Sequence, residues 1–216
     1  MKLQSTLVAA FAALMFASCG QSTPSATEAT DAVASDSAIV VNTIMSRHSI
    51  RKYKETPVEQ SKLQTVVNCG VNAPNAMNYQ PWAVRVVDSK EYIDGVTEVY
   101  KKANAEQVAK DANFKNMFRN APAIIAVAND TTNHYSQVDC GLMGENMIIA
   151  AQAMGLGTCV LGGPVRFLSS DPEAKPYLDK LELPENYALL YIIAIGYPDE
   201  SPEAKPRDMS KVKFVK

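Results

Sequence analysis

The feature that most constrains the fold is an apolar run near the C-terminus, ALLYIIAIG at residues 188–196. Its β-branched and aromatic residues are typical of a strand, and the run is long enough to lie in the centre of a sheet. Three further segments are also strand-like, namely WAVRVVDS at 82–89, AIIAVAN at 123–129 and TCVLGG at 158–163. The sequence therefore predicts a sheet with the C-terminal strand near its middle.

A helix is predicted to begin at TPVE, residues 56–59. Thr56 can cap the helix, Pro57 suits its first position, and Glu59 completes a capping box. A shorter helix is expected just before this region, over the apolar residues near 40–45.

The segment VDCGLMGENMIIAAQAMG, residues 138–155, predicts a buried helix. Gly141 and Gly144 would allow a neighbouring element to approach closely, and Gly155 suits the C-terminal end of the helix. Helices and strands are thus mixed along the chain without a regular β-α-β repeat. This order favours the α+β class over a doubly wound sheet.

The composition limits the possible functions. The chain has 216 residues and a formal net charge of −2, which argues against a nucleic-acid partner and leaves a small molecule or a protein. No phosphate-binding P-loop or G-x-S-x-G motif is present, and GLG at 155–157 lacks the third glycine of a dinucleotide fingerprint. His48 and His134 lack metal-ligand spacing, so we expect no metal. Difficult chemistry is left to an organic cofactor.

The first twenty residues, MKLQSTLVAAFAALMFASCG, resemble an export signal. We expect residues 1–18 to be a signal peptide, because the apolar run is too short for a permanent membrane span. FASC also resembles a bacterial lipobox, which implies lipidation of Cys19 and a membrane lipoprotein facing the periplasm or the cell exterior. Simple secretion, with cleavage nearby, is the alternative.

Residues 19–40 are rich in Ser, Thr and Ala and contain no aromatic ring. We expect a flexible tether, with a root-mean-square span of roughly 25 Å, followed by one domain over residues 41–216. The remaining cysteines, Cys69, Cys140 and Cys159, are expected to be buried free thiols rather than disulfide partners.

The segment RHSIRKY, residues 47–53, concentrates cations in a chain that is slightly acidic overall. In an extended backbone, Arg47, Ser49 and Arg51 lie on one side and offer donors to a phosphate. Lys205 and Arg207 in KPR repeat this spacing near the C-terminus. Taken alone, RHSIRKY is better explained as a solvated surface patch and KPR as a polar tail.

Two other segments suit a flat ligand. In LGGP, residues 161–164, Gly162 and Gly163 leave room for backbone N–H groups to approach a ring. In APNAMNYQPW, residues 73–82, two prolines stiffen a loop whose amides can meet ring carbonyls and sugar hydroxyls.

RHSIRKY, APNAMNYQPW, AMGLGTCVLGG, YIIAIGYPDE and KPRD, in this order, resemble the nitroreductase family of FMN-dependent oxidoreductases over roughly residues 41–216. The resemblance implies a three-layer α-β-α sandwich with a mixed, mainly antiparallel sheet. It also implies a homodimer with two FMN sites built from both chains. No catalytic side chain is expected, because the flavin takes electrons from NAD(P)H and passes them to a nitroaromatic, a quinone or a related small acceptor.

The resemblance also assigns roles to residues. Arg47, with His48 and Ser49 beside it, would hold the FMN phosphate, and Arg51 would lie near the flavin N1/C2 carbonyl. The residues expected to reach the flavin from the partner subunit are Pro74, Asn75, Ala76 and Asn78. Those expected to face the ring are Leu161, Gly162 and Gly163, while Lys205 and Arg207 would close on the phosphate. Residues 113–116 receive no role.

An exported reductase raises the question of its electron donor, since NAD(P)H is expected to be scarce outside the cytoplasm. A flavin-binding lipoprotein without NAD(P)H-driven turnover is therefore an alternative. Another FMN reaction, such as dehydrogenation or dehalogenation, is a second alternative that shares the same flavin chemistry.

Overall fold

The computed structural model describes residues 26–216, and side chains from residue 36 onward. The chain divides into two units between residues 40 and 41. Helix α1 runs over Ala26–Ser46, so residues 26–40 are helical and not the flexible coil expected for the tether. The physical reason is the high alanine content of this segment, since alanine has the highest helix propensity. The expected signal peptide, Cys19 and residues 20–25 lie outside the described residues.

The second unit contains the remaining elements. Its helices are α2 (Gln60–Val71), α3 (Lys90–Ala103), α4 (Ala105–Val108), α5 (Ser136–Ala153), α6 (Gly163–Ser170) and α7 (Lys175–Asp179). Short 3-10 turns are η1 (Ala76–Asn78) and η2 (Met209–Lys211). The strands are β1 (Trp82–Val87), β2 (Ala123–Asp130), β3 (Gly157–Leu161) and β4 (Tyr187–Gly196). Over residues 26–216, no helix is both long and apolar enough to cross a membrane.

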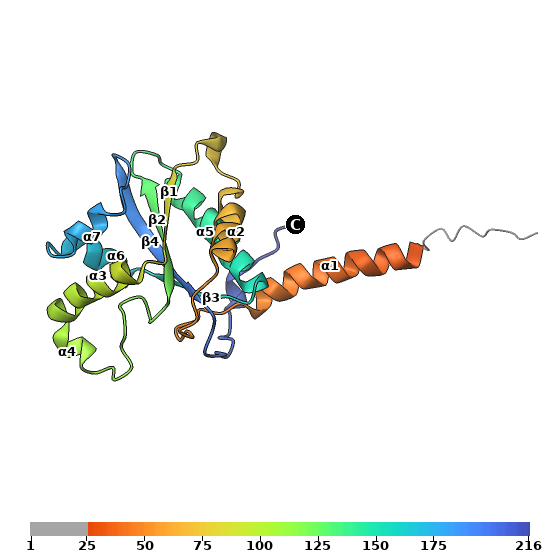
Figure 1. The fold of residues 1–216 in the computed structure, drawn as a ribbon. Helices are drawn as coiled ribbons and strands as arrows, with labels where there is room; N and C mark the ends of the chain where they lie inside the picture. Colours follow the sequence, from red (N-terminus) through yellow and green to blue (C-terminus); the bar gives the residue numbers. More distant parts are fainter. Residues whose placement is uncertain (1–25) are drawn as a thin grey trace, which may run out of the picture. The chain divides into compact units, whose positions relative to one another are not determined.

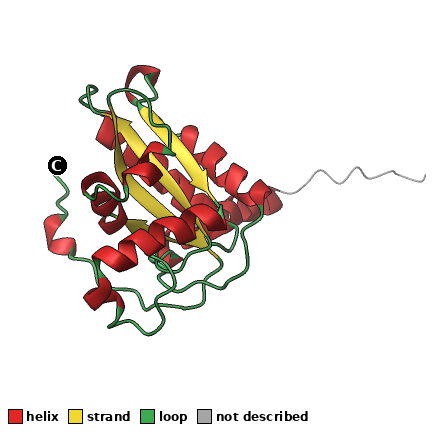
Figure 2. Ribbon diagram, turned by 60° about the vertical axis from the view of Figure 1, so that its left-hand side comes forward, coloured by secondary structure: helices red, strands yellow, loops and turns green. Residues whose placement is uncertain are grey.

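The four strands form an antiparallel sheet in the order β1-β2-β4-β3, with β4 in the interior as expected. Helices α2 and α5 cover one face, and α3, α6 and α7 cover the other (Figures 1 and 2). A single parallel bridge, Ser49 to Thr158, adds the mixed character at the edge of β3. The expectation of an α+β, three-layer α-β-α sandwich is confirmed.

Successive side chains of the buried strands point to opposite faces of the sheet and form two separate hydrophobic cores. On β2, Ile124 and Ala126 pack on the side of α3 and α6, whereas Ile125 and Val127 pack on the side of α2 and α5. The same alternation operates on β4. Because both faces are covered, β2 is buried along almost its whole length, which explains why its sequence is a continuous apolar run.

The expected helix start at Thr56 is wrong. Helix α2 begins at Gln60, and Glu59 occupies the capping position without a side-chain capping bond. Val58 is buried in one of the cores, so the chain must first pass inward in an extended form. The Glu59 carboxylate instead accepts a hydrogen bond from the Tyr197 hydroxyl at 2.6 Å.

Helix α5 agrees with its sequence signals at two glycines. A Cβ on Gly144 would collide with the ring of Tyr191, so this glycine does permit close packing, against β4. Gly155 follows the helix with a φ of 74°, the left-handed conformation that ends many helices. Gly141 is exposed, and none of the described residues packs within 4 Å of the place that its Cβ would take.

Among the described residues, Cys69, Cys140 and Cys159 are free thiols, and Cys140 and Cys159 are buried, as expected. Cys69 is exposed, so that part of the expectation is wrong. It lies on α2, whose inner face is formed by Leu63, Val66 and Gly70.

The segment that follows α1 is packed onto β3. The Ile50 N–H donates to the Thr158 carbonyl at 2.8 Å. A Cβ on Gly157 would lie 2.7 Å from Ile50 Cγ1, so only glycine fits this contact without movement. The position of residues 47–53 therefore depends on the small size of residue 157.

We predict that Gly157→Ala lowers the free energy of unfolding by about 1–3 kcal/mol, because the added methyl group pushes Ile50 away from β3. Gly141→Ala is the matched control, since its methyl group meets open space in a helix and should add roughly 0.5–1 kcal/mol. Urea unfolding of both variants measures the two effects. Equal stability of the two variants would contradict the packing argument.

Candidate functional site

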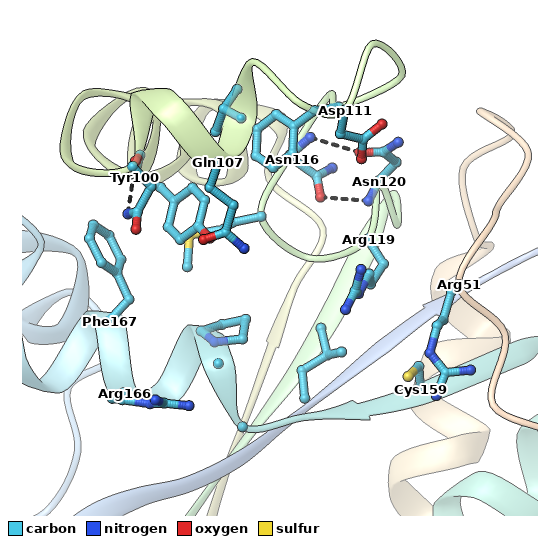
Figure 3. Close-up of a pocket in the computed structure, with 18 of the residues that line it drawn as sticks. Arg51, Tyr100, Gln107, Asp111, Asn116, Arg119, Asn120, Cys159, Arg166 and Phe167 are labelled. Atoms are coloured by element: carbon cyan, nitrogen blue, oxygen red, sulfur yellow. Dashed lines mark hydrogen bonds between the residues drawn. The ribbon is translucent and has the colours of Figure 1, made fainter.

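A cavity of the second unit has a volume of about 790 Å³. One wall is the segment between Tyr100 and Asn120, and the other is the end of β3 with the start of α6 (Figure 3). Arg51 lines the cavity as well, together with Leu161, Gly162 and Gly163. The structure thus brings two of the sequence-predicted segments, RHSIRKY and LGGP, to one site.

Backbone pairing positions Arg51. Residues 49–54 lie between β3 and the chain after β4, where the Lys54 N–H donates to the Tyr197 carbonyl and the Asp199 N–H donates to the Lys52 carbonyl, both at 2.9 Å. The Arg51 N–H donates to the Glu200 carboxylate. This fixed backbone leaves the Arg51 side chain exposed toward the cavity.

The side-chain hydroxyl of Tyr53 holds the same segment in place. Its hydroxyl donates to the Ile50 carbonyl at 2.6 Å and lies 3.3 Å from the Ala194 carbonyl. Burial is the main reason why the pKa of this hydroxyl is raised far above its usual value. Tyr53 therefore acts as a neutral hydrogen-bond donor under ordinary conditions.

The glycines leave a cradle beside Arg51. Neither Gly162 nor Gly163 has any atom within 4 Å of the place a Cβ would take. Side chains at these positions would project into that open space. The absence of side chains lets a planar ligand approach the backbone closely.

Arg47 has an unused donor. Its Nε atom lies 3.4 Å from a Glu145 carboxylate oxygen, close enough for an ion pair. The atom is buried, however, and makes no hydrogen bond to any of the described residues. A buried donor of this kind is costly unless an acceptor meets it, so a ligand phosphate is a fitting partner.

The loop that contains Pro74, Asn75, Ala76 and Asn78 lies elsewhere. The Ala76 N–H donates to the buried Asp139 carboxylate of α5, at 3.2 and 3.3 Å to its two oxygens. Asn75 Oδ1 accepts from the Gln80 N–H at 2.9 Å. The loop is therefore rigid, but none of its residues lines the cavity of the same chain.

Lys205 and Arg207 also lie outside the cavity. Both are exposed in the segment after β4, and Arg207 Nη1 donates to the Lys205 carbonyl at 2.9 Å. Within one described chain, the structure therefore unites Arg51 with Leu161, Gly162 and Gly163. It does not bring the other predicted residues to this cavity, and their contact with a flavin stays a prediction.

Sequence reasoning missed several cavity residues, above all Arg119 and Arg166. Arg166 comes three residues after Gly163, so one helical turn carries it to the cavity. Arg119 precedes β2 in FKNMFRNAP, where no familiar motif marks it. Asn116 also lines the cavity, whereas Lys115 forms an ion pair with Glu55 that lowers the pKa of that carboxyl group.

The cavity offers a flat, anionic ligand a cation, Arg51, and an open backbone at Gly162 and Gly163, while the buried Arg47 donor, outside this cavity, lacks a hydrogen-bond acceptor among the described residues. These features fit FMN, which combines a planar ring with a phosphate. A family model described as the nitroreductase family matches residues 44–197. The chain belongs to the nitroreductase family.

The relatives agree with this assignment. An NADPH-flavin oxidoreductase of Vibrio harveyi is 30% identical over 172 residues, which cover 77% of this chain and 69% of the relative. A solved FMN-dependent nitroreductase of Clostridium difficile R20291 is 26% identical, with a TM-score of 0.67, over 82% of this chain and 98% of the other. A nitroreductase with bound FMN from Bacteroides fragilis has a TM-score of 0.69 at 24% identity over the same shares and supports the fold.

Proposed function

We propose that this protein, an FMN-dependent oxidoreductase of the nitroreductase family, reduces nitroaromatics, quinones or a related small acceptor by two electrons with NAD(P)H as donor. The observation that carries the proposal is the convergence of Arg51 with Gly162 and Gly163 on one cavity. The flavin-oxidoreductase and nitroreductase relatives support the reaction class.

The chain's own residues bind and orient the cofactor. Arg47 supplies for the phosphate a donor that makes no hydrogen bond among the described residues, and Arg51 supplies a permanent positive charge beside the ring. Gly162 and Gly163 leave the backbone accessible. When bound, FMN supplies the redox chemistry between donor and acceptor.

A homodimer is part of the proposal. The rigid loop at residues 74–78 carries ligand-binding side chains by resemblance but does not line the cavity of its own chain. A second copy that places this loop over the cavity would complete the site.

Export and lipidation are proposed from the sequence alone. The signal-like residues 1–18 and the lipobox-like FASC ending at Cys19 support attachment to a membrane on the exported side. An exported reductase then needs an electron donor outside the cytoplasm, so reduction of the bound flavin by NADH or NADPH has to be measured directly.

We predict that Arg47→Ala weakens FMN binding by about 1.5–3 kcal/mol, the range for a charge-assisted hydrogen bond. Glu145→Gln is the matched control: it removes the neighbouring carboxylate, so FMN affinity should stay the same or rise. Quenching of flavin fluorescence during titration gives both dissociation constants. An unchanged FMN affinity in Arg47→Ala would remove the phosphate assignment.

The second prediction concerns turnover. Protein purified from residue 20 onward should show a flavin absorption spectrum that bleaches when NADH or NADPH is added without oxygen. Return of the spectrum on addition of a nitroaromatic or a quinone would establish the complete reaction. A bound flavin that fails to bleach would favour another donor or a binding role, and no flavin even after addition of FMN would contradict the proposal.

The third prediction tests the shared site. Arg47→Ala and Asn78→Ala chains, each weak in FMN binding, are mixed under conditions that exchange subunits. In a two-fold dimer each mixed pair has one intact site and one doubly altered site, so about a quarter of all sites should regain FMN. Light scattering of the wild-type protein should show a dimer. A monomer that holds FMN tightly would exclude the two-chain site.

A further inference from the structure

The cavity carries more positive charge than a flavin ring needs. Its charged lining residues are Arg51, Arg119, Arg166 and Asp111. Arg51 is accounted for by the cofactor, and Asp111 accepts a hydrogen bond from the Asn113 N–H at 3.0 Å. Two cations, Arg119 and Arg166, have no role in the proposed function.

Neither of these two guanidinium groups is engaged. Within residues 36–216, the side chains of Arg119 and Arg166 form no hydrogen bond and no ion pair. Figure 3 shows them on different walls of the cavity, Arg119 on the loop before β2 and Arg166 on α6. By contrast Lys115, on the same loop as Arg119, is neutralised by Glu55.

Arg119 is held in an uncommon backbone conformation. Its φ is 60°, and that of Asn120 is 62°. Non-glycine residues seldom adopt this region, and they keep it only when the surroundings enforce it. The neighbouring Phe118 is fully buried and anchors the turn to the core.

The Asn116 side chain is one of two that hold this backbone conformation in place. Its Oδ1 accepts from the N–H groups of Phe118 at 2.9 Å and Asn120 at 3.0 Å. Its Nδ2 donates to the Ala121 carbonyl at 3.1 Å. The Asn116 side-chain amide thus bonds to three backbone groups of the turn.

The Asn120 side chain is the second one that holds this backbone conformation. Its Oδ1 accepts from the N–H groups of Lys115 at 2.8 Å and Asn116 at 3.0 Å. Its Nδ2 donates to the Asn113 carbonyl at 2.8 Å. The side-chain amides of Asn116 and Asn120 fix the backbone of the loop from which the Arg119 side chain extends.

An aromatic wall lies in the same cavity. Tyr100 stacks on Phe114, with ring centroids 5.9 Å apart, and meets Phe167 edge-on at 5.1 Å. All three rings line the cavity. Such a wall suits the body of a flat, apolar molecule.

We propose that Arg119 and Arg166 bind an anionic group, carboxylate or phosphate, of the molecule that enters the cavity beside the flavin. The aromatic wall and the two unengaged cations together favour an aromatic acid as acceptor. A phosphate of the nicotinamide donor is the other source of the same chemistry. The inference rests on the proposed function, because it concerns the substrate side of that site.

The test compares benzoate with benzamide, two probes of similar shape that differ in charge. Calorimetry measures their binding to the wild-type protein, to Arg119→Gln, to Arg166→Gln and to the double variant, both with FMN and without it. Lys110→Gln is the control, since it removes a cation of the same segment that does not line the cavity. NADP⁺ is compared with NAD⁺ in the same way.

We expect the wild-type protein to bind benzoate more tightly than benzamide. Each single variant should weaken benzoate about tenfold and leave benzamide unchanged, as for loss of one charge-assisted hydrogen bond. The control should keep the wild-type preference. If the variants weaken NADP⁺ but not benzoate, the site serves the donor phosphate and the aromatic-acid assignment is overturned.

Turnover separates this inference from the proposed function. The double variant should still reduce the neutral 4-nitrobenzamide while losing activity toward 4-nitrobenzoate through a higher KM. Wild-type protein that shows no preference for benzoate over benzamide would overturn the anion site, even with the reductase activity intact. Absence of activity with both acceptors would count against the proposed function, while calorimetry would still report on the anion site.

Discussion

The structure of the site depends on one short piece of backbone pairing. Residues 49–54 are held on one side by β3, through Ile50 and Thr158, and on the other by the chain that leaves β4, through Tyr197 and Asp199. Because the pairing partners are β3 and the chain that continues directly from β4, the cationic segment is fixed to the sheet. Arg51 therefore lines the same cavity as the glycines that follow β3.

The cavity beside these glycines combines three kinds of surface. Open backbone at Gly162 and Gly163 suits a ring that must lie close, and fixed positive charge suits an anion. The aromatic wall supplies apolar area without adding flexible side chains. Two asparagine amides close the loop that carries Arg119, so the backbone at the base of this side chain is held in place. These three surfaces together support the proposed preference of the cavity for a flat, anionic ligand.

Much of the fold could be predicted from sequence, because the relevant signals are local. The apolar runs of β2 and β4 and the glycine after α5 need no knowledge of the rest of the chain. The start of α2 could not be predicted, because burial of Val58 overrode a good capping sequence. Helix α3 was missed although Ser89 caps it by accepting from the Tyr92 N–H. Within the site, Arg51 and the glycines lie in recognisable motifs, whereas Arg119 is brought in by a turn whose asparagine hydrogen bonds cannot be inferred from spacing.

The cationic segment, residues 47–53, also affects the edge of the sheet. β3 is the outermost strand, and an uncovered margin would offer free N–H and C=O groups to a strand of another molecule. Residues 49 and 50 cover part of that margin. The same stretch of chain thus covers part of a sheet edge and carries Arg51, the cation of this segment that lines the cavity. A substitution that loosens the pairing of residues 49 and 50 with β3 would therefore expose the strand edge and displace Arg51 at the same time.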